Sequence, residues 1–259
     1  MDVHLVAAFT DEAFAGNPAG VCFSAEVLEP ALMQRIAAEL RQPETAFLWP
    51  DGPSWSIRWF SPEVEVDLCG HATLAAAAVI FRDRPECTTA AFSATHHDLS
   101  AVRCADGMIS LDFPASTGCI WSAPVNVLAT IDAAPIAAAR FGNRWLLEFG
   151  DASEVRRLKP DFAALRATGI RSLIATACSD VPDFDIVSRN FAPLVGVDED
   201  QVTGAVHTCL ASYWESRLGP RLRCWQASRR GGGMNTHLSG DRVALDGRAV
   251  IEFSGRFYL

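Results

Sequence analysis

The sequence predicts an α/β protein of the α+β kind, made of two similar halves that each place a sheet around a central apolar helix. The first observation is a repeat: residues 58–62 and 189–193 both read R-x-F-x-P, and each is followed by E-x-x-x-[CT]-G. The matched residues Cys69 and Thr203 are 203 − 69 = 134 residues apart, about half of the 259-residue chain. The second observation is that an apolar run follows each copy, and the third is a series of short strand-like segments around both runs.

The first half begins with an apolar strand over 3–9 and a turn over 16–18, where Gly16 is expected to take a positive φ. Pro30 opens a helix that continues to about Leu40, because apolar residues recur on one face and proline fits the first helical position. Pro43 ends this region. Two further strands follow, over 44–49 and 56–60.

Residues 72–81 are apolar almost all round, and the run is too short to span a membrane, so a helix buried on every side is expected there. Residues 206–214 are the matching helix of the second half. The predicted halves are therefore 1–118, with its central helix at 71–82, and 119–259, with its central helix at 204–217 and a last strand that returns to the first half. Residues 114–126 are expected to link them, and 231–233 to form a flexible glycine turn. The other predicted strands cover 92–94, 108–113, 145–149, 173–177, 184–188, 222–227, 242–245 and 250–253.

Composition excludes several classes of protein. A formal net charge of −9 argues against nucleic acid or an anionic membrane as a partner. The eight cysteines include no C-x-x-C pair, which argues against a zinc ribbon, and most are expected to be buried small apolar residues. No metal site is expected. Without a signal-peptide or membrane-spanning pattern, we expect a soluble, cytoplasmic protein.

Five blocks in order along the chain resemble the PhzF-like family of phenazine biosynthesis. They are Gly-Asn-Pro at 16–18, Glu-Thr-Ala-Phe at 44–47, Cys-Gly-His-Ala-Thr-Leu-Ala at 69–75, Glu-Asp with Thr-Gly at 199–204, and Gln-Ala-Ser-Arg at 226–229. The resemblance implies the diaminopimelate-epimerase-like fold, in which two pseudo-symmetric halves each curl a mostly antiparallel sheet around a central helix. It also implies an active site in the cleft between the halves, no cofactor and a homodimer, for which Trp121 and Trp225 are candidate surface aromatics.

The same resemblance implies that Glu44 is the general acid/base of an isomerase, moving a proton between carbons of a small metabolite. Taking a proton from carbon requires a base held close to the substrate in a low-dielectric site. His71 follows Gly70 at the start of the first central helix and is expected to contact substrate or relay a proton. Asp200 is expected to orient His71 or to bind an amine or hydroxyl of the substrate.

The substrate is expected to carry a carboxylate, because a helix N-terminus that begins with glycine presents backbone N–H groups to an anion. The expected substrate-binding residues are Asn17, Gly70, Ala72, Thr203, Gly204 and Ala205. Two positions depart from the family pattern: Gln201 stands where proline is frequent, and Ala205 where serine is frequent. The missing hydroxyl removes one hydrogen-bond donor, so the isomerase class carries over more directly than the phenazine precursor does.

Two alternatives remain open. Epimerases and racemases of this fold use one cysteine from each half; Cys69 occupies the first position, but Thr203 occupies the second, and a hydroxyl is too weakly acidic to act alone as a carbon base. A non-catalytic small-molecule-binding or interaction protein is the other alternative. His207 is a weaker candidate for lining the site, as is the pair His96 and His97.

Overall fold

The computed structural model describes residues 1–96 and 98–258, and the chain divides into two compact units. The first unit contains Met1–Asp112 together with Asp246–Leu259, and the second contains Phe113–Leu245. The division thus lies at 112/113, compared with 118/119 in the sequence analysis. Strands β8 (Ile109–Pro114) and β17 (Arg242–Gly247) contain the two points at which the chain passes from one unit to the other.

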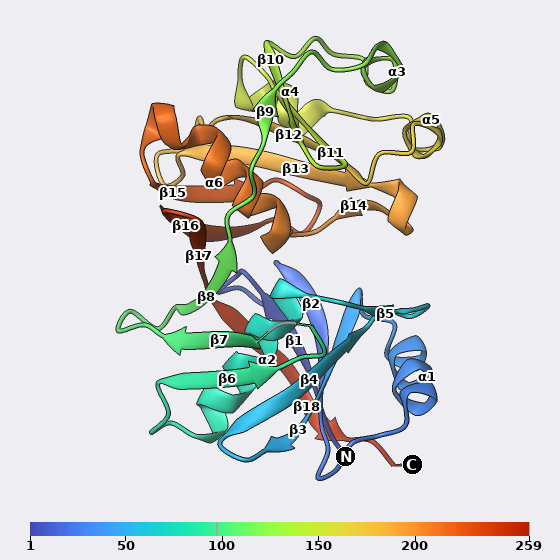
Figure 1. Cartoon of the computed structure of the whole chain (residues 1–259), viewed down its shortest axis with the longest axis vertical. Helices are drawn as coiled ribbons and strands as arrows, with labels where there is room; N and C mark the ends of the chain where they lie inside the picture. Colours follow the sequence, from blue (N-terminus) through green and yellow to red (C-terminus); the bar gives the residue numbers. More distant parts are fainter. Residues whose placement is uncertain (97, 259) are drawn as a thin grey trace. The chain divides into compact units, whose positions relative to one another are not determined.

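In the first unit a mostly antiparallel sheet surrounds helix α2 (Gly70–Asp83), as Figure 1 shows. The pairs β2–β3 and β4–β6 are parallel, and the N-terminal strand β1 pairs antiparallel with both β2 and β18. Helix α1 (Pro30–Leu40) packs against β3 and β4, where Met33, Ile36 and Phe47 are buried together. The strands are β1 (Asp2–Ala8), β2 (Asn17–Phe23), β3 (Glu44–Asp51), β4 (Ser54–Phe60), β5 (Glu65–Val66), β6 (Thr89–Ser93), β7 (Asp98–Arg103) and β18 (Ala249–Arg256).

Helix α2 is buried on nearly every side. All residues from His71 to Ala77 are buried, which a small-residue helix permits because alanine lets strands approach the helix backbone closely. The apolar run therefore predicts this helix and its burial correctly, with ends one residue outside the predicted 71–82.

The second unit repeats the arrangement around helix α6 (Gly204–Leu218). One face of its sheet packs against α4 and α5, where Leu147, Val155, Leu165 and Val187 belong to one apolar core. The strands are β9 (Cys119–Ile120), β10 (Ala137–Phe141), β11 (Arg144–Glu148), β12 (Ser172–Cys178), β13 (Ile186–Ala192), β14 (Val197–Asp200), β15 (Arg221–Gln226) and β16 (Gly232–Ser239). The remaining helices are α3 (Val125–Leu128), α4 (Ala152–Arg157), α5 (Phe162–Ala167) and the 3₁₀ turn η1 (Pro193–Val195).

The repeat in the sequence corresponds to a repeated strand pairing. Strand β4 pairs antiparallel with β3 and β5 and parallel with β6. Strand β13 pairs in the same way with β12, β14 and β15. In each unit the motif arginine is held by the motif glutamate: Arg58 lies 2.6 Å from Glu65, and Arg189 lies 2.7 Å from Glu199.

Some local expectations were wrong. Gly232 and Gly233 begin strand β16 and do not belong to a flexible turn, and the expected linker 114–126 contains β9 and part of α3. The turn at 16–18 is shorter than expected, because β2 already begins at Asn17. Gly16 does take the expected positive φ, +64°, and a Cβ there would lie 2.2 Å from the carbonyl oxygen of Ala8.

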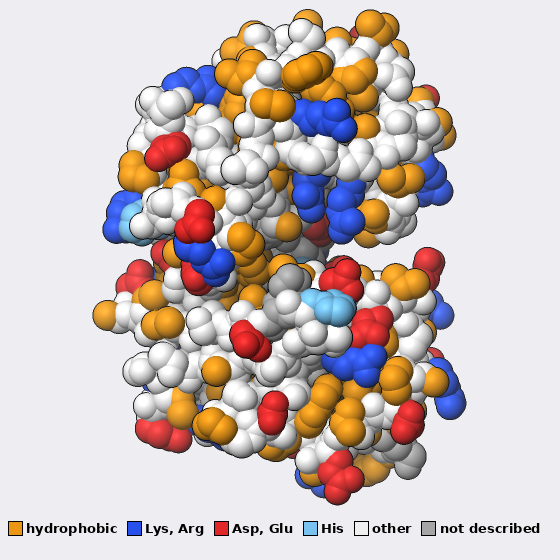
Figure 2. All heavy atoms as spheres, in the orientation of Figure 1, with side chains coloured by type: hydrophobic (Ala, Val, Ile, Leu, Met, Phe, Trp, Pro, Cys, Tyr) orange, Lys and Arg blue, Asp and Glu red, His pale blue; other side chains and the backbone are white. Residues whose placement is uncertain are grey.

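The expectation that most cysteines are buried was wrong, since only half of the eight are. The buried ones are Cys22, Cys69, Cys209 and Cys224, whereas Cys87 and Cys104 are half-buried and Cys119 and Cys178 are exposed. Figure 2 shows apolar side chains gathered on the second unit over the elements β9, β10 and α3. No helix in the described part of the chain is long and apolar enough to cross a membrane.

Candidate functional site

Glu44 and His71, two of the predicted catalytic residues, lie side by side in the first unit. Glu44 is the first residue of β3, and His71 is the second residue of α2. The His71 Nε2 atom lies 3.4 Å from Glu44 Oε2. The Glu44 side chain keeps 26% of its surface exposed whereas that of His71 keeps 8%, so a carboxylate that solvent or ligand can reach is supported by a buried ring.

His71 is a neutral imidazole at neutral pH. Burial lowers the pKa of His71 to about 4, and a hydrogen bond with the backbone of Pro18 offsets this only in part. A neutral ring carries one N–H and one lone pair, so it can donate a hydrogen bond at one nitrogen and accept one at the other. His71 can therefore position a carboxylate without forming a full ion pair with it.

Cys69 completes the group around this ring. Its Sγ lies 3.4 Å from His71 Nδ1, and the residue is buried as the N-cap of α2. Ligating atoms of Glu44, Cys69 and His71 all lie within 4.8 Å of one another. Carboxylate oxygen, thiolate sulfur and imidazole nitrogen are all zinc ligands, so these three side chains form a donor set that could hold a metal ion, although none was expected from the sequence.

The start of α2 also presents backbone donors. No side chain caps this helix at Cys69, and helix geometry leaves the N–H groups of Gly70, His71 and Ala72 without acceptors inside the helix. Anions are stabilised at such an end. Asn17, the other substrate-binding candidate of this unit, is fully buried at the first position of β2, next to the Pro18 that contacts His71.

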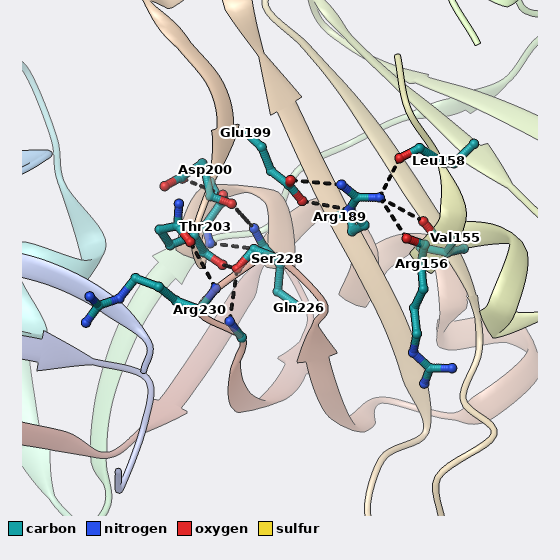
Figure 3. A network of polar contacts seen from close by, with 12 residues as sticks. Val155, Arg156, Leu158, Arg189, Glu199, Asp200, Thr203, Gln226, Ser228 and Arg230 are labelled. Carbon is teal, nitrogen blue, oxygen red and sulfur yellow. Dashed lines mark hydrogen bonds and ion pairs between the residues drawn. The ribbon is translucent and has the colours of Figure 1, made fainter. Parts of the chain in front are cut away.

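The second unit places Asp200 and Thr203 together, as Figure 3 shows. Thr203 Oγ1 donates a 2.5 Å hydrogen bond to Asp200 Oδ2 and accepts one from the Asn190 side-chain amide at 3.0 Å. This pairing fixes the side chain of Asp200, the last residue of β14, against the N-cap residue of α6. The expected contact of Asp200 with His71 stays a prediction.

Gln226 is the residue whose role the sequence analysis missed. It is fully buried; its Oε1 accepts from the Thr203 N–H at 2.9 Å, and its Nε2 donates to the Asp200 carbonyl at 2.8 Å (Figure 3). The residue lies in one of the five blocks that resemble the PhzF-like family, and that was the available signal. The sequence does not reveal its partners, because they are brought together by the pairing of β15 with β13 in the folded chain.

Thr203 is the N-cap of α6, which, like Cys69 at α2, makes no side-chain cap. Gly204 is buried and Ala205 is exposed, so the N-terminal turn of α6 has an accessible side. His207 does not line an open surface: it is fully buried, burial lowers its pKa to about 4, and its Nδ1 lies 2.8 Å from the Thr203 carbonyl oxygen. His96 is exposed on the loop after β6, and His97 lies outside the described residues.

The family model and the related proteins that match this chain point to the same family. Residues 6–255 match the family described as phenazine biosynthesis-like protein. An uncharacterized isomerase of Pseudomonas aeruginosa is 40% identical over 260 residues, covering 100% of this chain and 99% of that protein. The mouse phenazine biosynthesis-like domain-containing protein 1 is 36% identical, with 98% of each chain covered.

Solved structures agree. A phenazine biosynthesis PhzF-family protein of Enterococcus faecalis superposes with a TM-score of 0.94 at 35% identity, covering 100% of this chain and 99% of the other. A hydroxyproline epimerase of Agrobacterium vitis shares the fold, with a TM-score of 0.61 at 11% identity over 98% of this chain and 91% of that one. The expected diaminopimelate-epimerase-like fold is therefore confirmed, and the chain belongs to the PhzF-like family of phenazine biosynthesis-like proteins.

Proposed function

We propose that the protein is a cofactor-independent isomerase that moves a proton between carbons of a small, carboxylate-bearing metabolite, with Glu44 as the proton carrier. The observation that carries the proposal is the pairing of Glu44 with His71 at the uncapped start of α2. The relatives named isomerases, at 37–40% identity over nearly the whole chain, support the reaction class.

The proposed reaction conserves atoms and electrons. The Glu44 carboxylate takes a proton from one carbon of the substrate, and the electron pair of that C–H bond enters the conjugated system as an enol or enolate. Protonated Glu44 then returns the proton to a second carbon. Because nothing is oxidised or reduced, the substrate and the carboxylate suffice for the reaction.

The side chains and backbone around Glu44 have complementary roles in the proposal. Neutral His71 holds the carboxylate in place, and the N–H groups at the start of α2 stabilise the anionic carboxyl group of the substrate. The substrate contacts expected of Asp200, Thr203, Gly204 and Ala205 stay predictions.

Hydrogen–deuterium exchange in heavy water tests the role of Glu44. The natural probe is dihydro-hydroxyanthranilate together with a panel of small β,γ-unsaturated carboxylic acids, followed by proton NMR. We expect the wild type to exchange one carbon-bound proton of a compound that it binds, and Glu44→Gln to exchange it about 10²- to 10⁴-fold more slowly with binding retained. Full exchange by a Glu44→Gln variant that still binds would refute the proposal, and absence of exchange for every bound compound would favour a binding protein.

A homodimer is part of the proposal. In the second unit Ile120, Trp121, Val125 and Ile136 are each more than 60% exposed, and apolar surface of this kind is typical of protein interfaces. Trp225, the other aromatic considered in the sequence analysis, is half-buried against the core and does not belong to this surface. Light scattering is expected to give twice the chain mass of 28.0 kDa, and Trp121→Ser to shift the mass toward the monomer.

A further inference from the structure

The repeat shows which residue of the second unit corresponds to Glu44. Strands β3 and β12 pair with the motif strands β4 and β13 in the same register, since Thr45 and Leu173 each lie opposite the motif phenylalanine. The residue before Thr45 is Glu44, and the residue before Leu173 is Ser172. The position of the proposed proton carrier is therefore occupied by a serine in the second unit.

An arginine lies next to this serine. Arg144, the first residue of β11, pairs with Ser172 in the parallel register of β11 and β12. In the first unit Ala19 pairs with Glu44 in the corresponding register of β2 and β3. The two units thus have opposite charges in one region of the fold: a carboxylate beside a methyl group in the first, and a guanidinium beside a hydroxyl in the second.

The side chains of Arg144 and Ser172 both face α6. Leu147 and Leu173 belong to the core that packs against α4 and α5, on the opposite face of the sheet. Because side chains alternate along a strand, Arg144 and Ser172 point to the other face. Glu148 shares this face with Arg144, and it accepts hydrogen bonds from residues of α6.

Arg144 lies beside the N-terminal turns of α6. Glu148 Oε2 accepts a 2.6 Å hydrogen bond from the Tyr213 hydroxyl, which fixes one point at which β11 meets the helix. Arg144 is four residues earlier in β11, roughly 13 Å along the strand, and this length corresponds to about nine residues of helix. Cys209, in the second turn of α6, lies within range of the Arg144 charge. Both relationships put the guanidinium toward the start of α6.

The donors gathered here lack acceptors within the described part of the chain. Arg144 is half-buried and makes no hydrogen bond or ion pair with a described residue. Ser172 is only 3% exposed, and its Oγ has no hydrogen-bond partner. The N–H groups of Gly204 and Ala205, at the start of α6, also donate to no described residue. Because buried polar groups in proteins are nearly always paired, this set of donors indicates a ligand that accepts hydrogen bonds.

The charges favour an anionic ligand. Burial lowers the pKa of Arg144 and the nearby Arg171 guanidinium lowers it further, yet an arginine stays charged at neutral pH. The N-terminus of α6 adds a partial positive charge. A guanidinium offers two parallel N–H donors that match the two oxygens of a carboxylate. We propose that Arg144, Ser172 and the first turn of α6 bind the carboxylate of a small organic acid.

The inference goes beyond the proposed function, because every residue of this site belongs to the second unit and none of them moves a proton. The probes are propionate and propionamide, its neutral analogue of the same shape, added to the ¹⁵N-labelled full chain in a buffer without other oxyanions. The amide signals of Gly204 and Ala205 report binding at this site, and those of Gly70 and Ala72 report the anion contact proposed at α2. The two proposals can therefore fail separately.

We expect propionate to shift the signals of Gly204 and Ala205, and propionamide to bind at least about tenfold more weakly. Arg144→Met is expected to weaken propionate binding about 10- to 100-fold, and Ser172→Ala about 2- to 10-fold. Arg171→Met is the matched control, because it removes the same charge from an exposed neighbour. Its Kd for propionate is expected to stay within about twofold of the wild type.

Arg144→Met removes a half-buried charge that no described residue neutralises, so we expect its Tm to be no lower than that of the wild type. Where this variant fails to fold, Arg144→Lys keeps the charge but loses the paired donors, and is expected to bind propionate about tenfold more weakly. Equal shifts from propionate and propionamide, or wild-type affinity in Arg144→Met or Arg144→Lys, would overturn the proposal. An equal loss in Arg144→Met and Arg171→Met would also overturn it, because net charge alone would then explain the binding.

Discussion

The sulfur of Cys69 lies 3.4 Å from Nδ1 of His71, whose other ring nitrogen lies 3.4 Å from the carboxylate of Glu44. A carboxylate and a thiol, either of which could carry a proton, thus both lie beside one buried imidazole, within 4.8 Å of one another. The proposed isomerase uses the carboxylate, whereas a two-thiol epimerase would use the sulfur.

Cys69→Ser distinguishes these two reactions. A serine hydroxyl can still contact His71 but is a very poor carbon base, so an epimerase would lose nearly all activity. We expect exchange by Cys69→Ser to remain within about tenfold of the wild type, since Glu44 carries the proton. The measurement is deuterium incorporation into the same compound used for Glu44→Gln; a loss as large as that of Glu44→Gln would favour the epimerase.

In the turn before β2, Gly16 occupies a position where we expect even alanine to destabilise the fold. Gly16 has φ +64°, and a Cβ there would lie 2.2 Å from the Ala8 carbonyl oxygen, a distance that requires the backbone to move. We expect Gly16→Ala to cost about 3 kcal/mol or more in the free energy of unfolding.

Gly142 is the matched control for this prediction. Its φ is +58°, but a Cβ there meets nothing within 4 Å, so Gly142→Ala is expected to cost only about 1 kcal/mol from the unfavourable φ. Calorimetric unfolding of both variants checks the comparison. Equal losses would show that the steric contact at Ala8 contributes little.

The two buried histidines predict that the fold weakens in mild acid. Burial lowers the pKa of His71 and of His207 from 6.5 to about 4. Between pH 6.5 and pH 4 both histidines are protonated in the unfolded chain but neutral in the native chain. The free energy of unfolding therefore falls as the pH falls from about 6.5 to about 4. The contribution is complete above pH 6.5 and amounts to about 3 kcal/mol per histidine.

His207→Gln tests this pH dependence. Glutamine can still donate to the Thr203 carbonyl but does not titrate, so the variant is expected to lose less stability than the wild type between pH 7 and pH 4.5. The exposed His96→Gln is the control and is expected to follow the wild type. Thermal unfolding by circular dichroism at both pH values gives the comparison, and parallel curves for all three proteins would contradict the prediction.

The sequence predicts best where local chemistry and packing agree. Helix α1 runs from Pro30 to Leu40 as predicted, because proline favours its first turn and the apolar spacing matches one buried face. Prediction fails at β16, where Gly232 and Gly233 read as a turn. A Cβ at Gly233 would lie 3.1 Å from Phe184, so here glycine serves close approach between segments far apart in sequence.

The residues of the candidate site could likewise be predicted from the sequence only in part. Glu44 and His71 were named from a family resemblance, and no spacing along the chain shows that they meet. The role of Gln226 depends on the pairing of Ser188 with Gln226 between parallel strands, which only the folded chain displays. Motifs thus identified the reacting groups, and tertiary pairing was needed to find the side chains that hold them.

The division of the chain also sets an order of folding during synthesis. The first unit needs its last strand, since β18 pairs with the N-terminal β1 from Asp2 to Ala8, whereas the second unit is one continuous stretch, Phe113–Leu245. On the ribosome, the second unit is therefore complete before β1, which already has β2 on one side, receives β18 on the other. The unit that contains Glu44 is therefore begun before the second unit and completed after it, when β18 is added to its sheet.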